Sequence, residues 1–396
     1  MPKINPDILI WGRQTAGLSL DEAANKLGLR DTKAVFAQDQ LLLLETGEKE
    51  PSRAILLKMA KHYRRPLLAF YMTSPPQKGV RGSDFRTLPE ASSQAENAVL
   101  DTMIRQIRAR QNMVRALMED EDDAERVNFI GSVNIDYGTD AVCDSIRTTL
   151  NFQLSEFRKI RTVENAFSYL RQNVEACGVF VILMGNLGSH HTTLSVEVFR
   201  GFALSDALAP FVIINDQDAK SAWSFTLLHE LVHLWLGETG VSGSINDVAT
   251  ERFCNDVASE LLLPSNELPS LMENWSENLT LNKAHIDDFA RARNLSSSMV
   301  VYKLYRKNFI DKATWKAISK DYRDRWFLQR AQDRAASRNQ DSGPSYYMVR
   351  RHRLGTALLQ FVNRTMAEGV LTTSKAGAIL GVKPQNIQSL MGTVSQ

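Results

Sequence analysis

The sequence has few cysteines and no long apolar run, and these absences exclude several classes of protein. Its three cysteines, Cys143, Cys177 and Cys254, are odd in number and far apart in a chain of 396 residues. They form neither a disulfide framework nor a Cys-x-x-Cys metal site, which predicts a reducing, cytoplasmic location. The N-terminus lacks the apolar run of a signal peptide, and no window reaches the roughly 18 apolar residues of a membrane span. We therefore expect no membrane partner.

A large excess of charge is also absent. The formal net charge is +2, with 43% apolar and 23% charged residues. This composition is typical of an ordinary globular protein. It excludes a strong overall attraction to nucleic acid or to anionic lipid, but it leaves room for a local basic patch.

The pattern of residues changes several times along the chain, and the length suggests about two to three domains. Short helical patterns give way to a polar connector, then to three β-rich runs, and then to further helices. This order predicts an α+β fold that is mostly helical. The expected segments are an N-terminal helix-turn-helix-like domain (1–73), a linker and helical connector (74–137), a central domain with a small sheet and a metal-binding helix (138–300), and a C-terminal helical domain (301–396).

Local signals place several elements within these segments. Ser19 is a good N-cap for a helix that ends at Gly28. Branched and aromatic residues between Gly, Asn and Asp predict three strands. The expected strands lie within 178–184, 197–204 and 210–216, and loops rich in Pro, Gly and Ser are expected at 74–83 and 339–345.

The strongest chemical signal is the run HELVH within residues 224–237. His229 and His233 are four residues apart, so on a helix they share one face and both imidazoles can reach one metal ion. Glu230 follows His229 directly and is placed to act as a general base on a metal-bound water. Zinc lowers the pKa of such a water to about 7, so a carboxylate can take its proton near neutral pH.

The residues around this motif are almost all apolar, so the helix is expected to be buried on nearly all sides. Two histidines and a glutamate are costly to bury there unless a partner such as a metal compensates them. The plainer alternative is a pair of core histidines that hydrogen-bond to the backbone. The apolar neighbours are Phe225, Leu227, Leu228, Leu231, Val232, Leu234, Trp235 and Leu236.

A catalytic zinc needs a third protein ligand and one open position. The next predicted helix, ATERFCNDVASELLLP, offers Glu251 and Asn255, which are four residues apart and face the same way. We predict Glu251 as the third ligand and Asn255 as the residue that orients a ligand histidine or Glu251 itself. Glu260 on the same helix remains the alternative ligand, or a solvated or capping carboxylate.

HELVHLWLG and ERFCNDVASELLLP resemble the ImmA/IrrE family of zinc metallo-endopeptidases. RGFAL and PFVIINDQD upstream are similar to the run that precedes the catalytic helix in that family. A Cro/repressor-like helix-turn-helix segment at the N-terminus, HYRRPLLAFYM, DFRT, GPSYY and LGVKPQNI resemble members with this fused arrangement. The resemblance therefore covers most of the chain.

The resemblance implies a gluzincin-like catalytic domain that cleaves a repressor or regulator protein, and so switches stress or mobile-element genes. It implies His229, His233 and Glu251 as zinc ligands and Glu230 as the catalytic glutamate. Such a peptidase often holds its substrate as a strand added to a sheet edge, for which residues 199–204 and 211–215 are candidates. His190 and His191 are candidate oxyanion donors, although an adjacent histidine pair in a polar loop is more often simply exposed.

The N-terminal segment is a poor match to a DNA-reading domain. Its expected recognition helix holds Asp39 and four leucines, and there is no Arg or Lys between Lys33 and Lys49. Only Gln38 and Gln40 are suited to contact bases, and the turn before them is several residues too long. DNA binding there is weakly supported, and a protein-contact module is the alternative.

The residue pattern of the C-terminal segment 372–391 is also compatible with a helix-turn-helix. An ordinary pair of packed helices is the plainer interpretation. The basic run RRHR at 350–353 is most simply a solvated helix face.

Three functions follow from these observations. The first is a zinc-dependent peptidase whose partner is a specific repressor or regulator, expected to be encoded nearby. The second is a helix-turn-helix transcription regulator or stress sensor that keeps the peptidase fold for ligand or partner binding. The third is an antitoxin-like scaffold.

Overall fold

The computed structural model describes residues 4–32, 35–76, 93–120, 124–189, 192–238, 248–337 and 345–392, without the side chains of Gln94 and Arg334. These residues fall into two compact units. One unit is drawn from residues 1–81, 88–107 and 186–198, and the other from 82–87, 108–185 and 199–396. Several expectations lie outside the described residues, namely most of the 74–83 linker, the DFRT segment, His190, His191 and most of the 339–345 loop.

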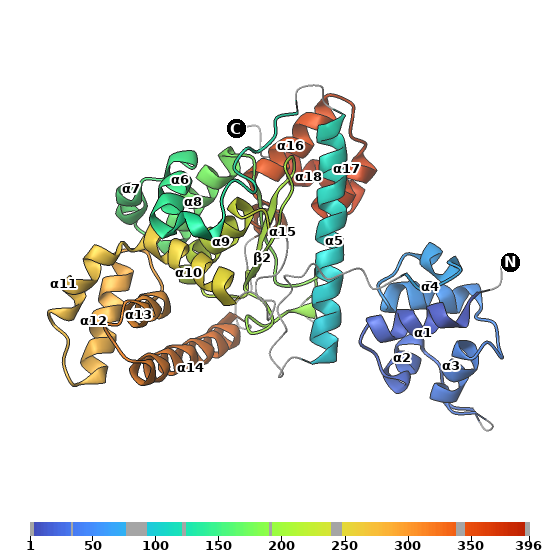
Figure 1. Ribbon diagram of the computed structural model, residues 1–396. Coiled ribbons are helices and arrows are strands. Elements are labelled where there is room, and N and C mark those ends of the chain that lie inside the picture. The colour runs from blue at the N-terminus through green and yellow to red at the C-terminus, as the bar shows by residue number, and fades with distance from the viewer. Residues whose placement is uncertain are drawn as a thin grey trace. The chain divides into compact units, whose positions relative to one another are not determined.

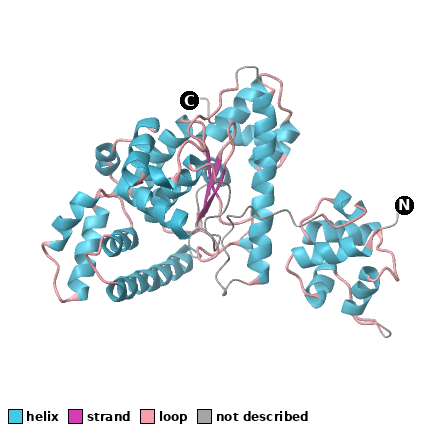
Figure 2. Cartoon of the chain, viewed as in Figure 1, coloured by secondary structure: helices cyan, strands magenta, loops and turns pink. Residues whose placement is uncertain are grey.

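Helices make up most of the structure, and the strands that the described residues form belong to one small sheet (Figure 2). The expected α+β, mostly helical fold class is confirmed. None of the described helices combines the length and the apolar content needed to cross a bilayer. Cys143, Cys177 and Cys254 are free thiols.

Short helices form most of the first unit (Figure 1). Ser19 accepts from the backbone N–H of Glu22, whose side chain accepts from the N–H of Ser19, and Gly28 ends the helix in a left-handed conformation. Apolar side chains from these helices share one small core, which includes Leu9, Leu41 and Phe70. The elements are α1 (Pro6–Thr15), α2 (Leu20–Leu27), α3 (Ala37–Glu45), α4 (Arg53–His62) and η1 (Leu67–Tyr71), followed by α5 (Gln94–Glu119), which supplies residues to both units.

The second unit holds the sheet and the remaining helices. Up to the sheet its elements are η2 (Ile135–Tyr137), α6 (Thr139–Thr149), α7 (Leu154–Lys159), α8 (Val163–Ala176), β1 (Phe180–Leu183), β2 (Gly201–Leu204) and β3 (Phe211–Ile214). Beyond it they are α9 (Lys220–Trp235), α10 (Val248–Leu262), η4 (Ser265–Glu267), α11 (Leu268–Met272), α12 (Leu279–Arg291), α13 (Ser297–Arg306), α14 (Lys312–Ser337), α15 (Tyr346–Leu354), α16 (Thr356–Ala367), α17 (Thr373–Leu380), η5 (Pro384–Asn386) and α18 (Ile387–Met391).

The sheet has the order β1-β3-β2, and all of its residues are buried. β1 runs parallel to β3, with Phe180 opposite Phe211, whereas β2 runs antiparallel to β3, with Gly201 opposite Ile214. All three predicted strands are present, but the second begins only at Gly201. β3 is central, so residues 211–215 do not form a sheet edge. β2 is an edge strand of the described sheet.

α9 packs against β2, β3, α8 and α10, so it is covered on nearly every side. Residues Trp223 and Ser224 and the run from Thr226 to Trp235 are buried. The indole of Trp235 stacks on Phe129 with ring centroids 3.8 Å apart. The apolar composition of the motif helix therefore reflects a place in the centre of the second unit, as predicted.

The basic run at residues 350–353 is not a solvated face. Arg350 donates to the carbonyl oxygens of Leu380 and Gly381, at the C-terminal end of α17. Arg351 donates to the carbonyl of Leu390 near the end of α18. Helix C-termini carry unpaired carbonyls and partial negative charge, so arginines are well suited to cap them. The sequence pattern gave no sign of these long-range partners.

Candidate metal centre

Helix α9 brings the two motif histidines together. His229 and His233 lie one turn apart with ring centroids 5.0 Å apart. Their Nε2 atoms are separated by 3.3 Å, so both imidazoles turn the same nitrogen toward one point. Both residues are buried, with relative exposures of 6% and 5%.

Helix α10 supplies the carboxylate that completes the group. Glu251 Oε2 lies 3.5 Å from His229 Nε2, and Glu251 Oε1 lies 3.4 Å from His233 Nε2. The three residues form the candidate metal-ligating group of the described structure.

The size of this triangle tests whether a metal fits. Zinc bonds to nitrogen and oxygen are about 2.0–2.2 Å long, so two ligands of a tetrahedral ion lie roughly 3.4 Å apart. The three observed separations, 3.3, 3.5 and 3.4 Å, match one face of such a tetrahedron. Two neutral imidazoles and a carboxylate are also a donor set that zinc prefers. The residues present therefore fit a zinc-sized cation.

The electrostatics of the group follow from burial and proximity. Burial opposes charge on Glu251, but His229 and His233 hold the pKa of its carboxyl well below the usual range. Burial also opposes charge on His233, but Cys254, Glu238 and Glu251 around the ring raise its pKa well above the usual value. The buried group therefore pairs positive with negative charge away from water. A bound cation would likewise compensate the negative charge of Glu251.

Glu238 holds the far side of the His233 ring. Its Oε2 lies 2.9 Å from His233 Nδ1. When Nδ1 carries the proton, the lone pair of Nε2 faces Glu251, which is the tautomer that a metal ligand requires. The sequence analysis missed Glu238. The available signal was a carboxylate five residues after His233, directly after Gly237, which adopts the left-handed conformation that ends the helix.

Asn255 was predicted to orient a ligand. It lies one turn after Glu251 on α10 and is partly buried. Among the described residues its side chain makes no hydrogen bond to either histidine or to Glu251. Glu238 and Cys254 contact His233 from outside the group.

Glu230 lies beside the ligands rather than among them. It is 1% exposed and follows His229 on α9. Its carboxylate approaches the backbone of β2 so closely that a Cβ built on Gly201 would lie 2.8 Å from Oε1. The missing side chain of Gly201 therefore leaves the space that Glu230 occupies.

Glu260, the alternative ligand, points elsewhere. Lys303 Nζ lies 2.7 Å from its carboxylate, and the backbone N–H of Ser265 donates to it at 2.8 Å. Lys303 is itself 1% exposed, so Glu260 serves as its counter-ion between α10 and α13. The structure places Glu251, and not Glu260, next to the histidines.

The two glutamines proposed for DNA contact differ in their surroundings. Gln38 is exposed, but Gln40 is half-buried and its Nε2 donates to the carbonyl of Arg30 at 2.7 Å. Gln40 therefore binds the segment between α2 and α3 through its hydrogen bond to Arg30.

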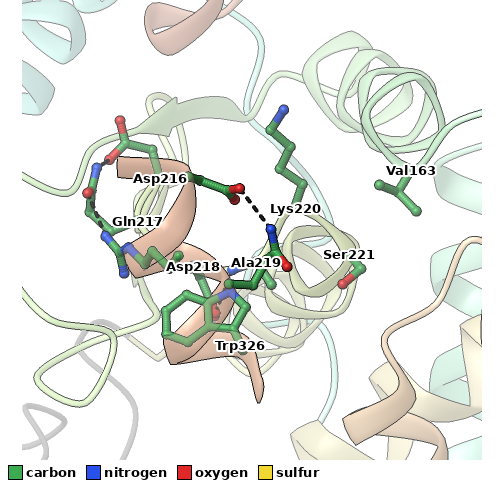
Figure 3. A pocket seen from close by; sticks show the side chains of 11 residues that line it. Val163, Asp216, Gln217, Asp218, Ala219, Lys220, Ser221 and Trp326 are labelled. Carbon is green, nitrogen blue, oxygen red and sulfur yellow. Dashed lines mark hydrogen bonds between the residues drawn. The ribbon is translucent and has the colours of Figure 1, made fainter. Parts of the chain in front are cut away.

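The second unit also has an open cavity of about 760 Å³ at the other end of α9. Figure 3 shows Asp216, Lys220 and Trp326 among the side chains that line it. Lys220 precedes His229 by nine residues, which is roughly 14 Å along a helix. The cavity is therefore separate from the candidate metal centre.

Comparison with known families agrees with the geometry of the centre. Residues 184–305 match a peptidase family model described as the IrrE N-terminal-like domain. This range includes His229, Glu230, His233 and Glu251. The match supports the predicted resemblance to the ImmA/IrrE family. It does not extend to the N-terminal helices or to α14–α18. No curated protein and no solved structure matches the chain.

Proposed function

We propose that the protein is a zinc-dependent metallo-endopeptidase that cleaves a specific regulator protein. The observation that carries this proposal is the triangle of His229, His233 and Glu251, whose edges fit one face of a zinc tetrahedron. The match of residues 184–305 to a peptidase family adds independent support.

His229, His233 and Glu251 would hold the ion. When bound, zinc would supply a Lewis acid for a peptide carbonyl and would make a water molecule acidic near neutral pH. Glu230 accepts the proton of the attacking water and delivers it to the nitrogen of the leaving amine. Burial of Glu230 keeps bulk water away from this proton transfer. Glu238 keeps the ring of His233 in place.

The substrate backbone would lie along β2. Among the strands of the described residues, β2 pairs with β3 alone, and its first residue, Gly201, adjoins Glu230. In an extended peptide that pairs with β2, the scissile bond would lie close to the carboxylate of Glu230.

A repressor or regulator encoded nearby is the proposed substrate, on the strength of the ImmA/IrrE resemblance. The first unit is suited to protein contact, because it exposes several large apolar side chains. These are Phe36 (64% exposed), Leu42 (44%), Leu57 (50%) and Leu68 (78%).

The test uses the full-length, zinc-loaded protein and purified regulators encoded beside its gene. The wild type should cleave one of them at a defined bond, as shown by intact-mass measurement. Glu230→Gln should bind zinc normally but cleave at least about a hundredfold more slowly, because the general base is lost. Glu273→Gln, at an exposed position beyond α11, is the matched control and should cleave at the wild-type rate. Equal cleavage by the wild type and Glu230→Gln, or intact regulators with both, would refute the proposal.

A further inference from the structure

The last helices of the chain form a compact helix-turn-helix. α17 and the η5–α18 segment (Pro384–Met391) are joined by Gly381, Val382 and Lys383. A connection of three or four residues that contains Gly is typical of this motif. Figure 1 shows α16, α17 and α18 grouped together near the end of the colour scale.

Two glycines shape the turn after α17. A Cβ on Gly377 would lie 2.8 Å from the carbonyl oxygen of Val382, so no larger residue fits against the turn. Gly381 has φ +61°, the left-handed conformation that ends α17 and starts the turn. The N–H of Val382 donates to the carbonyl of Gly377 at 3.0 Å and fixes the reversal.

The second helix keeps one polar face open. Ile387 and Leu390 are buried and face the preceding helices. Gln385, Gln388 and Ser389 are exposed on the other side, following the helical repeat. Within the described part of the chain, the amides of Gln385 and Gln388 make no hydrogen bond.

The charge of this region differs from that of the whole protein. Residues 345–392 contain six Lys and Arg residues and one acidic residue, Glu368, whereas the entire chain has a net charge of +2. The four arginines contact carbonyl or carboxylate oxygens of the protein, so the two exposed lysines are the cations of this region best placed to contact a ligand. Lys375 and Lys383 are exposed on α17 and on the turn. Exposed lysines that flank a polar helix are the electrostatic pattern of phosphate contact.

The N-terminal helix pair lacks these features. Nine residues, 28–36, separate α2 from α3. Gln40 is engaged by the carbonyl of Arg30, and Leu42 is 44% exposed on the helix that would have to read bases. A leucine-rich helix offers few groups that can hydrogen-bond to base edges.

We propose that the C-terminal helix-turn-helix binds duplex DNA, with the Gln385–Gln388–Ser389 face of the η5–α18 segment in the major groove and Lys375 and Lys383 on the DNA backbone. Glutamine recognises adenine through a pair of hydrogen bonds to N6 and N7, so the two glutamines would carry sequence preference. The lysines would supply affinity that depends on salt but not on sequence. This function is separate from the proposed peptidase chemistry.

In the experiment, the full-length protein is mixed with a pool of randomised DNA duplexes, and the duplexes that it binds are enriched over several rounds. Binding of the enriched duplex is then measured by fluorescence anisotropy. The wild type should enrich a defined sequence. Gln385→Ala and Gln388→Ala should each weaken binding to it about tenfold, since one bidentate base contact is lost. Lys383→Ala should weaken binding to all duplexes alike. It should also reduce the slope of log binding constant against log salt concentration by about 1, because one phosphate contact is lost. Gln38→Ala on α3 is the matched control and should bind like the wild type.

Thermal melting should show that each variant folds as the wild type does, because all four side chains are exposed. Failure to bind any duplex would overturn the proposal, as would binding that survives both C-terminal glutamine variants or is lost in Gln38→Ala. Loss of a co-purifying protein from the Gln385→Ala and Gln388→Ala variants, without any duplex binding, would assign the surface to a protein partner and overturn it as well.

Discussion

The ring of His233 is held from two sides, by Glu238 at Nδ1 and by Glu251 near Nε2. Groups that orient a ligand histidine usually contribute about 10–100-fold to metal affinity. We therefore expect Glu238→Ala to weaken zinc binding by this factor, as measured by competition with a chromophoric chelator. Glu273→Ala, an exposed residue beyond α11, is the control and should leave the affinity unchanged. Equal zinc affinity in both variants would show that Glu238 does not position the ring.

Gly201 gives Glu230 its space. A Cβ at this position would lie 2.8 Å from Oε1 of Glu230 and 2.8 Å from Cγ2 of Thr226. In Gly201→Ala the carboxylate must move, and a displacement near 1 Å costs roughly a hundredfold in rate. We expect regulator cleavage to fall by that factor while zinc affinity stays at the wild-type value. A variant with full activity would mean that Glu230 is not held against β2.

The sequence predicted the local parts of this site but not the distant ones. His229, Glu230 and His233 follow from helical spacing alone. Glu251 was predicted as the third ligand, and Glu260 on the same helix remained the alternative. The decision depends on Lys303, which lies far along the chain and takes Glu260 as its partner. Gly201 depends on a tertiary contact that no local pattern encodes, whereas Glu238 lies only five residues after His233 and was overlooked.

At the scale of elements, the Lys303–Glu260 pair joins α10 to α13. Burial opposes charge on Glu260, but Lys303 and Ser265 lower the pKa of its carboxyl below the usual value. A carboxylate whose pKa is lowered by folding stabilises the protein above its unfolded pKa of about 4.3, and this contribution disappears as pH falls through the folded pKa.

Glu260→Gln should therefore destabilise the protein by about 3 kcal/mol at pH 7, since it leaves Lys303 buried without its counter-ion. Urea unfolding at a series of pH values should show the difference from the wild type shrinking below about pH 4. Glu273→Gln is the exposed control and should unfold like the wild type at every pH. A difference that does not change with pH would mean that the charge of Glu260 is not what stabilises the pair.

The predicted elements were accurate where a local signal marks their ends. Ser19 and Gly28 bound α2, as predicted. The second strand was predicted too long, because Val198 and Phe199 are apolar but fill the core from a turn instead of pairing in the sheet. Apolar composition indicates burial more directly than it indicates a strand.

For the molecule as a whole, the candidate metal centre and the first unit belong to different cores. The ligands lie on α9 and α10, which are central to the second unit, whereas α1–α4 pack around Leu9, Leu41 and Phe70. A ligand that binds only the folded form stabilises the unit that contains its site, by about 2.7 kcal/mol when its free concentration is a hundred times Kd. Units with separate cores need not unfold together.

We therefore expect zinc removal to affect the two units unequally. Addition of a chelator should lower the Tm of the second unit and speed amide hydrogen exchange in α8–α10, while exchange in α1–α4 stays unchanged. Glu251→Ala should exchange in α8–α10 like the chelated wild type and should not respond to the chelator, because the metal-binding triangle has lost its carboxylate. Glu260→Gln should still respond. A uniform change along the chain would show that the two units are coupled, and no change at all would show that His229, His233 and Glu251 do not hold a metal.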